Sequence, residues 1–418
     1  MYRIVSSVVV CLLVVINMTA HADDIQTIDK IYDENIKTVR LFPLLNNPER
    51  ELLSSAAPLN GQFTLLLQFD HLYGDYENYF VKFIHCNADW SISRLFPLDY
   101  LDDFNEFHIE EYEFSFNTKV PYIHYQFTLP NFKKSGNYLL VVYRDSESDL
   151  ALTKRFMIYE NKFGMMDEPR NKPTNKGARS NQQIQFSLNY TRGVIDNPYR
   201  NVKVTIRQNQ RWDNAKKLLP PTFANEAAGT IDFRQFGGEN EFEAGNEFRF
   251  FDLRSLRYFG RNVQTVDLTK QIDIATLEPD KFRGSDGYGE NKDLNGKFEI
   301  PHPYESDYAF VEYFLELNEP LNGKVYLASA LTQWSRDEQF LLEYLAERKG
   351  YYGVFLLKQG FYNYQYLVNG STGLSANYIE GNHSETENEY DILVYYHSFR
   401  EDIDLLYGYF TLSANPRF

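Results

Sequence analysis

Cysteine is scarce in this 418-residue chain, which has two. Cys11 lies inside an apolar run near the amino terminus, and the cleavage expected after that run leaves only Cys86. A single cysteine excludes an intramolecular disulfide framework. An exported protein of this size without disulfides fits a bacterial periplasm better than a eukaryotic extracellular space, where such bridges are common.

Basic residues are also few, because 42 Lys and Arg stand against 58 Asp and Glu, for a net charge of −16. Nucleic acids and anionic membranes bind clusters of Lys and Arg. The balance therefore argues against both as partners.

Long apolar runs are confined to the amino terminus. Arg3 precedes the apolar residues 4–16, and the small residues Ala20 and Ala22 stand where signal peptidase needs them. The run is shorter than the roughly 20 residues that span a bilayer. We expect residues 1–22 to be a cleaved signal peptide, the mature chain to reside in the periplasm, and no direct membrane insertion.

Strand patterns fill the rest of the chain, and aromatic residues, which favour strands, make up 16% of it. Phe63, Leu65, Leu67 and Phe69 alternate at period two, as on one face of a strand. Further strand-like stretches occur at residues 79–86, 123–129, 137–143 and 152–159. Short strands at this spacing predict an all-β fold of tandem immunoglobulin-like or early-set β-sandwich domains.

Two polar stretches, residues 163–181 and 281–296, interrupt these patterns and read as linkers. They predict an N-terminal domain over 30–162, a middle domain over 182–280 and a C-terminal, early-set-like domain over 297–418.

One segment is ambiguous in secondary structure. Residues 336–349 are the best helical candidate in the chain, but residues 340–344 read equally well as a strand.

No catalytic constellation is apparent, and we expect no enzyme activity. Cys86 follows His85, but neighbouring residues on a strand point to opposite faces, so they are badly placed as a nucleophile and base. Residues 369–373 approach a nucleophile elbow, but Asn369 stands where that motif has glycine. We interpret this stretch as a turn.

Metal and cofactor sites are likewise not indicated. The histidines lack the spacing of a metal pair, and no Cys-x-x-Cys occurs. Asp286, Glu290 and Asp293 are candidate calcium ligands, but they do not match the EF-hand pattern and read more simply as a solvated loop.

Two segments end strands with polar residues and a tryptophan, at residues 87–90 and 211–214. Trp90, Trp212 and Arg211 either shape corners of the sandwiches or serve as anchors for a partner protein. We take these three as the candidate partner contacts.

Tyr362, Tyr364 and Tyr366 alternate in a predicted strand of the last domain, which looks like glycogen-binding early-set sandwiches. Their common face is either core or a platform that stacks on sugars.

Several segments together resemble one family, the plug proteins of the type IX secretion system. They are residues 83–90, 112–118, 120–122, 129–131, 134–138, 152–156, 208–214, 245–249 and 252–255. The resemblance runs from about residue 36 to the carboxyl terminus. It implies a periplasmic protein that docks on the periplasmic opening of the outer-membrane translocon barrel and seals the idle channel, without catalytic residues or a cofactor.

Two other functions compete with this one. The tyrosines of the last domain favour a glycan-binding or cell-surface module. The terminal Phe418 is compatible with a transmembrane barrel, but residues 79–86 are apolar on both faces, which favours a sandwich.

Overall fold

The computed structural model describes residues 25–59, 61–166, 170–171, 180–284, 287–289, 293–370 and 373–416. The expected signal peptide lies outside the described residues, as do Asp286 and Glu290. The fold is all-β and consists of sandwich domains, as predicted.

Domain one is a sandwich of two mainly antiparallel sheets. The first sheet contains β1 (Lys30–Ile31), β10 (Leu150–Tyr159), β9 (Gly136–Tyr143), β5 (Phe80–Cys86) and β6 (Phe107–His108), with β3 (Ala56–Pro58) on β10. The second contains β2 (Ile36–Pro43), β4 (Leu65–Leu72), β8 (Tyr122–Thr128) and β7 (Glu111–Phe114). Two short helices, η1 (Arg50–Leu52) and α1 (Pro97–Tyr100), lie in its loops.

The core of domain one lies between these sheets. Leu65, Leu67 and Phe69 of β4 are all buried in it, which confirms the period-two pattern. Phe69 stacks on Tyr125 of β8, and both rings meet Tyr79 edge to face. Offset and edge-to-face ring pairs of this kind add about 1 kcal/mol each beyond area burial.

Domain two combines two distant parts of the chain. One sheet contains β11 (Phe163–Met165), β13 (Asn181–Tyr190), β17 (Thr230–Phe233) and β16 (Phe223–Asn225), with β12 (Arg170–Asn171) and β18 (Glu241–Glu243) on β13. The other contains β15 (Lys216–Leu219), β14 (Val202–Gln208), β29 (Asn388–Ser398) and β30 (Ile403–Ala414), and α2 (Pro198–Asn201) precedes β14.

Domain three lies between these two parts in the sequence. Its sheet runs through β19 (Arg249–Asp252), β28 (Phe361–Asn369), β25 (Lys324–Ala328), β26 (Leu341–Leu345), β27 (Gly350–Lys358), β24 (Tyr308–Glu316), β21 (Asp273–Leu277) and β20 (Val263–Asp267). Strand β22 (Asp280–Lys281) pairs with β24, and β23 (Phe298–Glu299) pairs with β28. The sheet folds over a shared core, where Tyr364 of β28 meets Tyr313 of β24.

The predicted domain boundaries do not follow these sheets. The boundaries put residues 388–414 in the last domain, but β29 pairs with the whole of β14 and completes domain two. Residues 249–277, which the predicted boundaries include in the middle domain, belong to domain three. Periodicity locates strands but does not reveal which strands pair when their partners are far apart in the sequence.

The ambiguous segment at 336–349 contains a strand. Residues 338–340 form the 3-10 turn η2 (Glu338–Phe340), and β26 follows it directly. The helical alternative is wrong, because β26 joins β25 to β27 within the sheet and tertiary pairing overrides local propensity.

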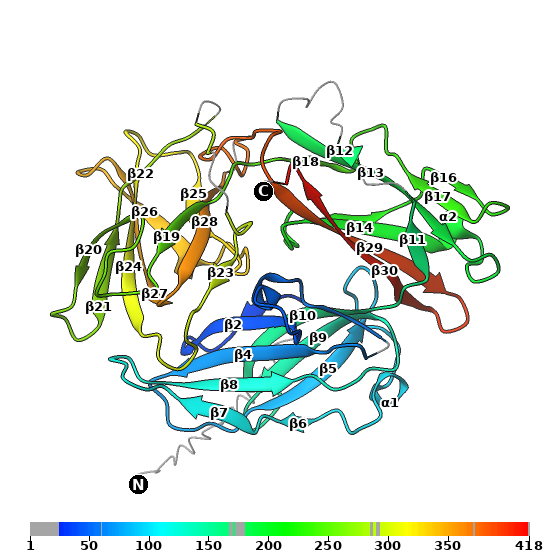
Figure 1. Cartoon of the computed structure of the whole chain (residues 1–418), viewed down its shortest axis with the longest axis horizontal. Helices are drawn as coiled ribbons and strands as arrows, with labels where there is room; N and C mark the ends of the chain where they lie inside the picture. Colours follow the sequence, from blue (N-terminus) through cyan, green and yellow to red (C-terminus); the bar gives the residue numbers. More distant parts are fainter. Residues whose placement is uncertain are drawn as a thin grey trace, which may run out of the picture.

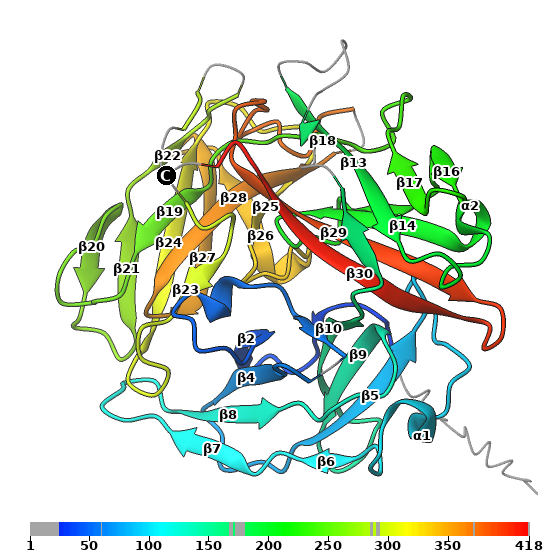
Figure 2. The same ribbon diagram turned by 45° about the vertical axis from the view of Figure 1, so that its right-hand side comes forward.

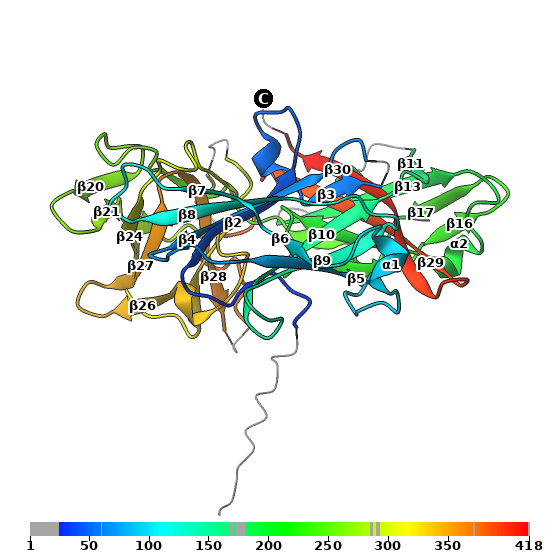
Figure 3. The same ribbon diagram turned by 90° about the horizontal axis from the view of Figure 1, so that it is seen from below.

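The three domains surround a common centre (Figure 1), with domain three at the left, domain two at the right and domain one below. The turned view keeps β2 and β4 of domain one next to domain three and places β30 over domain one (Figure 2). Seen from below, the molecule is a wide, shallow plate (Figure 3).

His85 and Cys86, neighbours on β5, face opposite sides as expected. Cys86 is buried, and burial raises the pKa of its thiol to about 12. His85 donates from Nε2 to the carbonyl oxygen of Ser135 at 3.2 Å, and its Nδ1 lies 2.8 Å from the hydroxyl of Ser93. One neutral tautomer satisfies both contacts. Burial lowers the pKa of His85 to about 4.

This lowered pKa predicts that the fold weakens in acid. The unfolded chain protonates His85 near pH 6.5, whereas the folded chain resists protonation down to about pH 4. Stability is therefore present above pH 6.5 and lost as the pH falls toward 4, by about 3 kcal/mol for this group. Urea unfolding at several pH values should show this loss in the natural chain and a smaller one in His85→Gln. An equal loss of stability with falling pH in the two proteins would contradict the conclusion that His85 is neutral in the folded chain.

Candidate functional site

The predicted contact residues Trp90 and Trp212 lie between domains one and two. Trp90 is only 3% exposed, and its ring meets that of Trp212 edge to face, with centroids 5.0 Å apart. The guanidinium of Arg155 lies 4.6 Å from the Trp90 centroid and 5.4 Å from that of Trp212. Arg207 covers Trp212 at 4.4 Å. This tryptophan–arginine cluster joins two domains of the same chain.

Arg211, the third predicted contact, lies where domain two meets domain three. It is 6% exposed, pairs with Asp213 through two hydrogen bonds of 3.0 and 2.7 Å, and stands 4.5 Å from the ring of Trp334. Trp334 in turn packs on Phe248. The interpretation of these residues as a surface for a partner is thus corrected: Trp90 and Arg211 are covered by their own chain, and Trp212 is half-buried in the same cluster.

A buried ion pair of domain two also contacts domain one. Arg207 of β14 binds Asp391 of the neighbouring β29, and the same nitrogen donates to the hydroxyl of Ser54 in domain one at 2.8 Å. Close by, the hydroxyl of Tyr395 donates to the side chain of Asn137 in β9 at 2.8 Å.

Domains one and three meet around the carboxylate of Asp70. It accepts hydrogen bonds from Lys358 and His124, each at 2.6 Å, and from the hydroxyl of Tyr308 at 2.5 Å. Tyr308 also contacts the hydroxyl of Thr38 at 2.6 Å. We call Asp70, His124, Tyr308 and Lys358 the Asp70 network.

Charge within the Asp70 network is balanced although its side chains are almost fully buried. Burial by itself raises the pKa of Asp70, but Lys358 and His124 outweigh it and hold this pKa below the ordinary value. Burial lowers the pKa of Lys358 to about 8, against the opposing effect of Asp70. The carboxylate and the ammonium are thus both charged at neutral pH.

Asp307, next to Tyr308, extends the same junction. Its carboxylate accepts from the backbone N–H groups of Lys119 and Val120 in domain one, at 2.5 and 3.0 Å. Lys119 also pairs with Asp273 of β21.

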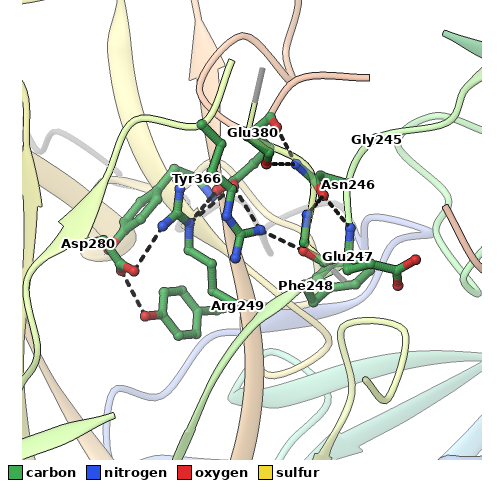
Figure 4. A network of polar contacts seen from close by, with 12 residues as sticks. Gly245, Asn246, Glu247, Phe248, Arg249, Asp280, Tyr366 and Glu380 are labelled. Atoms are coloured by element: carbon green, nitrogen blue, oxygen red, sulfur yellow. Dashed lines mark hydrogen bonds and ion pairs between the residues drawn. The ribbon is translucent and has the colours of Figure 1, made fainter. Parts of the chain in front are cut away.

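Domains two and three are joined by the segment from Gly245 to Arg249 (Figure 4). The side-chain amide of Asn246 donates to the carbonyl of Glu380 at 2.7 Å and to that of Gly287 at 2.8 Å, while its oxygen accepts from the N–H of Gly289 at 2.9 Å. Asn246 therefore holds three loops together and uses both ends of its amide.

Arg249, the first residue of β19, anchors the end of this segment in domain three (Figure 4). Its Nε donates to both carboxylate oxygens of Glu380 at 3.0 Å, and Nη1 donates to Asp280 at 2.9 Å. Tyr366 donates its hydroxyl to the same Asp280 at 2.7 Å. Burial alone lowers the pKa of Arg249, but these carboxylates raise it well above the ordinary value. Segment 245–249, which links β18 of domain two to β19 of domain three, is thus fixed at its domain-three end.

The tyrosines considered as a sugar platform are part of the core. Tyr362, Tyr364 and Tyr366 are all buried, and the hydroxyls of the last two donate to Asp280. A stacking platform needs exposed rings, so this interpretation is wrong.

The calcium hypothesis can be followed only at Asp293, because Asp286 and Glu290 lie outside the described residues. The carboxylate of Asp293 accepts from the backbone N–H groups of Phe248 and Asn295, and burial, with Glu247 nearby, raises its pKa to about 8. In the described part of the chain, no three His, Cys, Asp or Glu residues are grouped as a metal site.

The helices among the described residues lack the length and apolarity of a membrane span.

Sequence reasoning missed the Asp70 network and the Arg207–Asp391 pair. The available signal was a carboxylate or lysine inside an otherwise apolar strand, as in residues 65–72 and 350–358. Such residues are buried only when they are paired.

The comparisons with known proteins agree with this architecture. Residues 36–160 match the family model described as the first domain of the type 9 secretion system plug protein. Domain one belongs to the plug family of the type IX secretion system. The resemblance seen in the sequence is confirmed over this range.

A solved structure extends the likeness beyond the plug-family domain. The chain is 29% identical to a hypothetical protein from Parabacteroides merdae, over 93% of this chain and 100% of the other, with a TM-score of 0.86. The two proteins thus share an architecture across nearly the whole chain. No curated protein matches the chain.

The Asp70 network predicts that Lys358→Met is strongly destabilising. The variant leaves a buried carboxylate without its cation, which costs about 3–5 kcal/mol of unfolding free energy. The matched control is Lys324→Met, because the Lys324–Glu338 pair is exposed to solvent and such pairs contribute little to stability. Urea unfolding measures both, and similar losses in the two variants would show that the network contributes little.

Proposed function

We propose that this protein is a periplasmic plug that docks on the periplasmic opening of the type IX secretion translocon and seals the idle channel. The observation that carries the proposal is the match of residues 36–160 to the plug-protein domain. The translocon barrel in the outer membrane is then the partner, and the protein acts by binding rather than by catalysis.

The shape and the internal connections of the molecule support this role. A seal has to cover an opening and resist deformation, and the three domains form a wide plate (Figure 3). Each pair of domains is joined by buried charged groups: the Asp70 network, the Arg207–Asp391 pair with Ser54, and Arg211 of domain two over the ring of Trp334 in domain three. Interfaces of this kind oppose the relative motion expected of loosely linked domains.

The glycan-binding alternative loses the observation that motivated it. The three alternating tyrosines are core residues, and two of their hydroxyls are already bonded within the protein.

A deletion strain tests the plug function directly. Without the protein, we expect the outer membrane to admit a hydrophilic antibiotic too large to cross it normally, because the channel stays open. The protein supplied from a plasmid should restore the barrier, and its tagged form should co-purify with the translocon barrel.

Two controls make this test specific. A strain lacking both the protein and the translocon should regain the barrier, because no channel is left to leak. Unchanged permeability in the single deletion, together with no co-purification, would refute the plug function.

A further inference from the structure

Strand β7 is the free edge of the second sheet of domain one. Among the described residues it pairs only with β8, and all four of its residues are exposed. It lies along the lower margin of the molecule in Figure 1, away from domain two. An exposed strand edge is a ready template for pairing with another chain.

The hydrogen-bond register shows which groups of β7 are free. Just beyond the strand, the N–H of Ser115 donates to the carbonyl of Tyr122 at 2.8 Å. Antiparallel strands alternate between bonded and non-bonded pairs, so Glu111 and Glu113 also face β8. The peptide groups of Tyr112 and Phe114 therefore point outward.

The next outward residue shows that this edge accepts a partner. Phe116 donates its N–H to the carbonyl of Tyr304, in domain three, at 2.9 Å. One end of the edge is thus already hydrogen-bonded within the chain. The outward peptide groups of Tyr112 and Phe114 lie further along the same edge and have no partner among the described residues.

The side chains of β7 divide into an aromatic and an acidic face. Tyr112, Phe114 and Phe116 are 38%, 61% and 63% exposed, and Tyr112 contacts both Phe114 and Tyr76. Glu111 and Glu113 alternate with them and are exposed on the opposite face. The shortness of the strand and its glutamates protect the edge against aggregation, but such protection does not call for three exposed aromatic rings.

We propose that β7 is a docking edge, which binds an extended segment of another protein as an added antiparallel or parallel strand. Main-chain hydrogen bonds to Tyr112 and Phe114 provide the attachment, and side chains on alternate faces provide the selectivity. The segment carries Lys or Arg opposite Glu111 and Glu113, and apolar side chains opposite the aromatic face. The proposal rests on the proposed function for the identity of the partner, the translocon.

Charge decides against a second copy of this chain as the occupant. Pairing of β7 with another β7 would place glutamates of the two chains opposite one another on the same face. Like charges directly opposite in a sheet are destabilising. A segment with Lys or Arg at these positions is instead attracted by the glutamates of β7.

The first experiment reverses the charge of the docking edge in the full-length protein. Glu111→Lys/Glu113→Lys should weaken co-purification with the translocon barrel about tenfold or more, because like charges then meet across the contact. The matched control is Glu343→Lys/Glu347→Lys, which makes the same change of net charge at exposed positions of domain three. Urea midpoints of both variants should equal that of the natural chain.

A second variant separates strand addition from a simple charge contact. Tyr112→Pro removes an outward N–H while leaving the bonds to β8 in place, as proline is tolerated on edge strands. It should weaken co-purification, whereas Tyr112→Phe should not. A photocrosslinking phenylalanine at position 114 should capture the barrel, and one at Tyr258, an exposed residue of domain three, should not.

The outcomes separate this proposal from the plug function. If the natural chain co-purifies with the barrel but the charge and proline variants bind equally well, the docking edge is refuted and the plug function stands. If position 114 captures a second copy of the chain, the edge serves self-association and the proposal also fails. If the natural chain never binds the barrel, the plug function fails, and the assignment of this partner to β7 fails with it.

Discussion

A single buried carboxylate, that of Asp70, determines how domain one meets domain three. Its three donors come from β8 of its own sheet and from β24 and β27 of the neighbouring domain. A carboxylate without partners in such a place would be too costly to keep charged. The two sandwiches must therefore lie close enough, and at the right angle, for Lys358 and Tyr308 to reach it.

The other two junctions follow the same rule with different residues. Arg207 and Arg155 hold Trp212 and Trp90 between domains one and two, and Arg211 of domain two lies over Trp334 of domain three. Buried ionic contacts are weak evidence for stability, but removal of one partner is costly. They specify geometry, because each contact is satisfied in only one arrangement of the domains. Three sandwiches thereby act as one plate, and its surface remains available for contacts with a larger partner.

The strands and the fold class were predictable from the sequence because they depend on local alternation. Leu65, Leu67 and Phe69 face the core as their spacing requires. The role of Trp90 and Arg211 was not predictable in this way, since an aromatic residue at the end of a strand serves equally as an anchor for a partner or as packing between domains. Nor does spacing show that Val202 lies opposite Tyr396, almost two hundred residues later. Such pairings depend on the whole chain, and the resemblance to a family does not locate a binding surface.

Domain three is inserted between the two halves of domain two, and this arrangement fixes the order in which the molecule can be completed. Strand β14 has no neighbour on one side until β29 has been synthesised. The chain crosses between domains two and three twice, near Gly245 and near Thr386. The hydroxyl of Thr386 donates a hydrogen bond to the carbonyl of Gly245 at 3.0 Å, which ties the two crossings together. Domain one can close as soon as Tyr159 is present, whereas domain two waits for Ala414. Throughout this interval an unpaired strand edge is exposed, the kind of surface on which incomplete chains aggregate. The last strands of the polypeptide thus turn a set of partly folded domains into the finished plate.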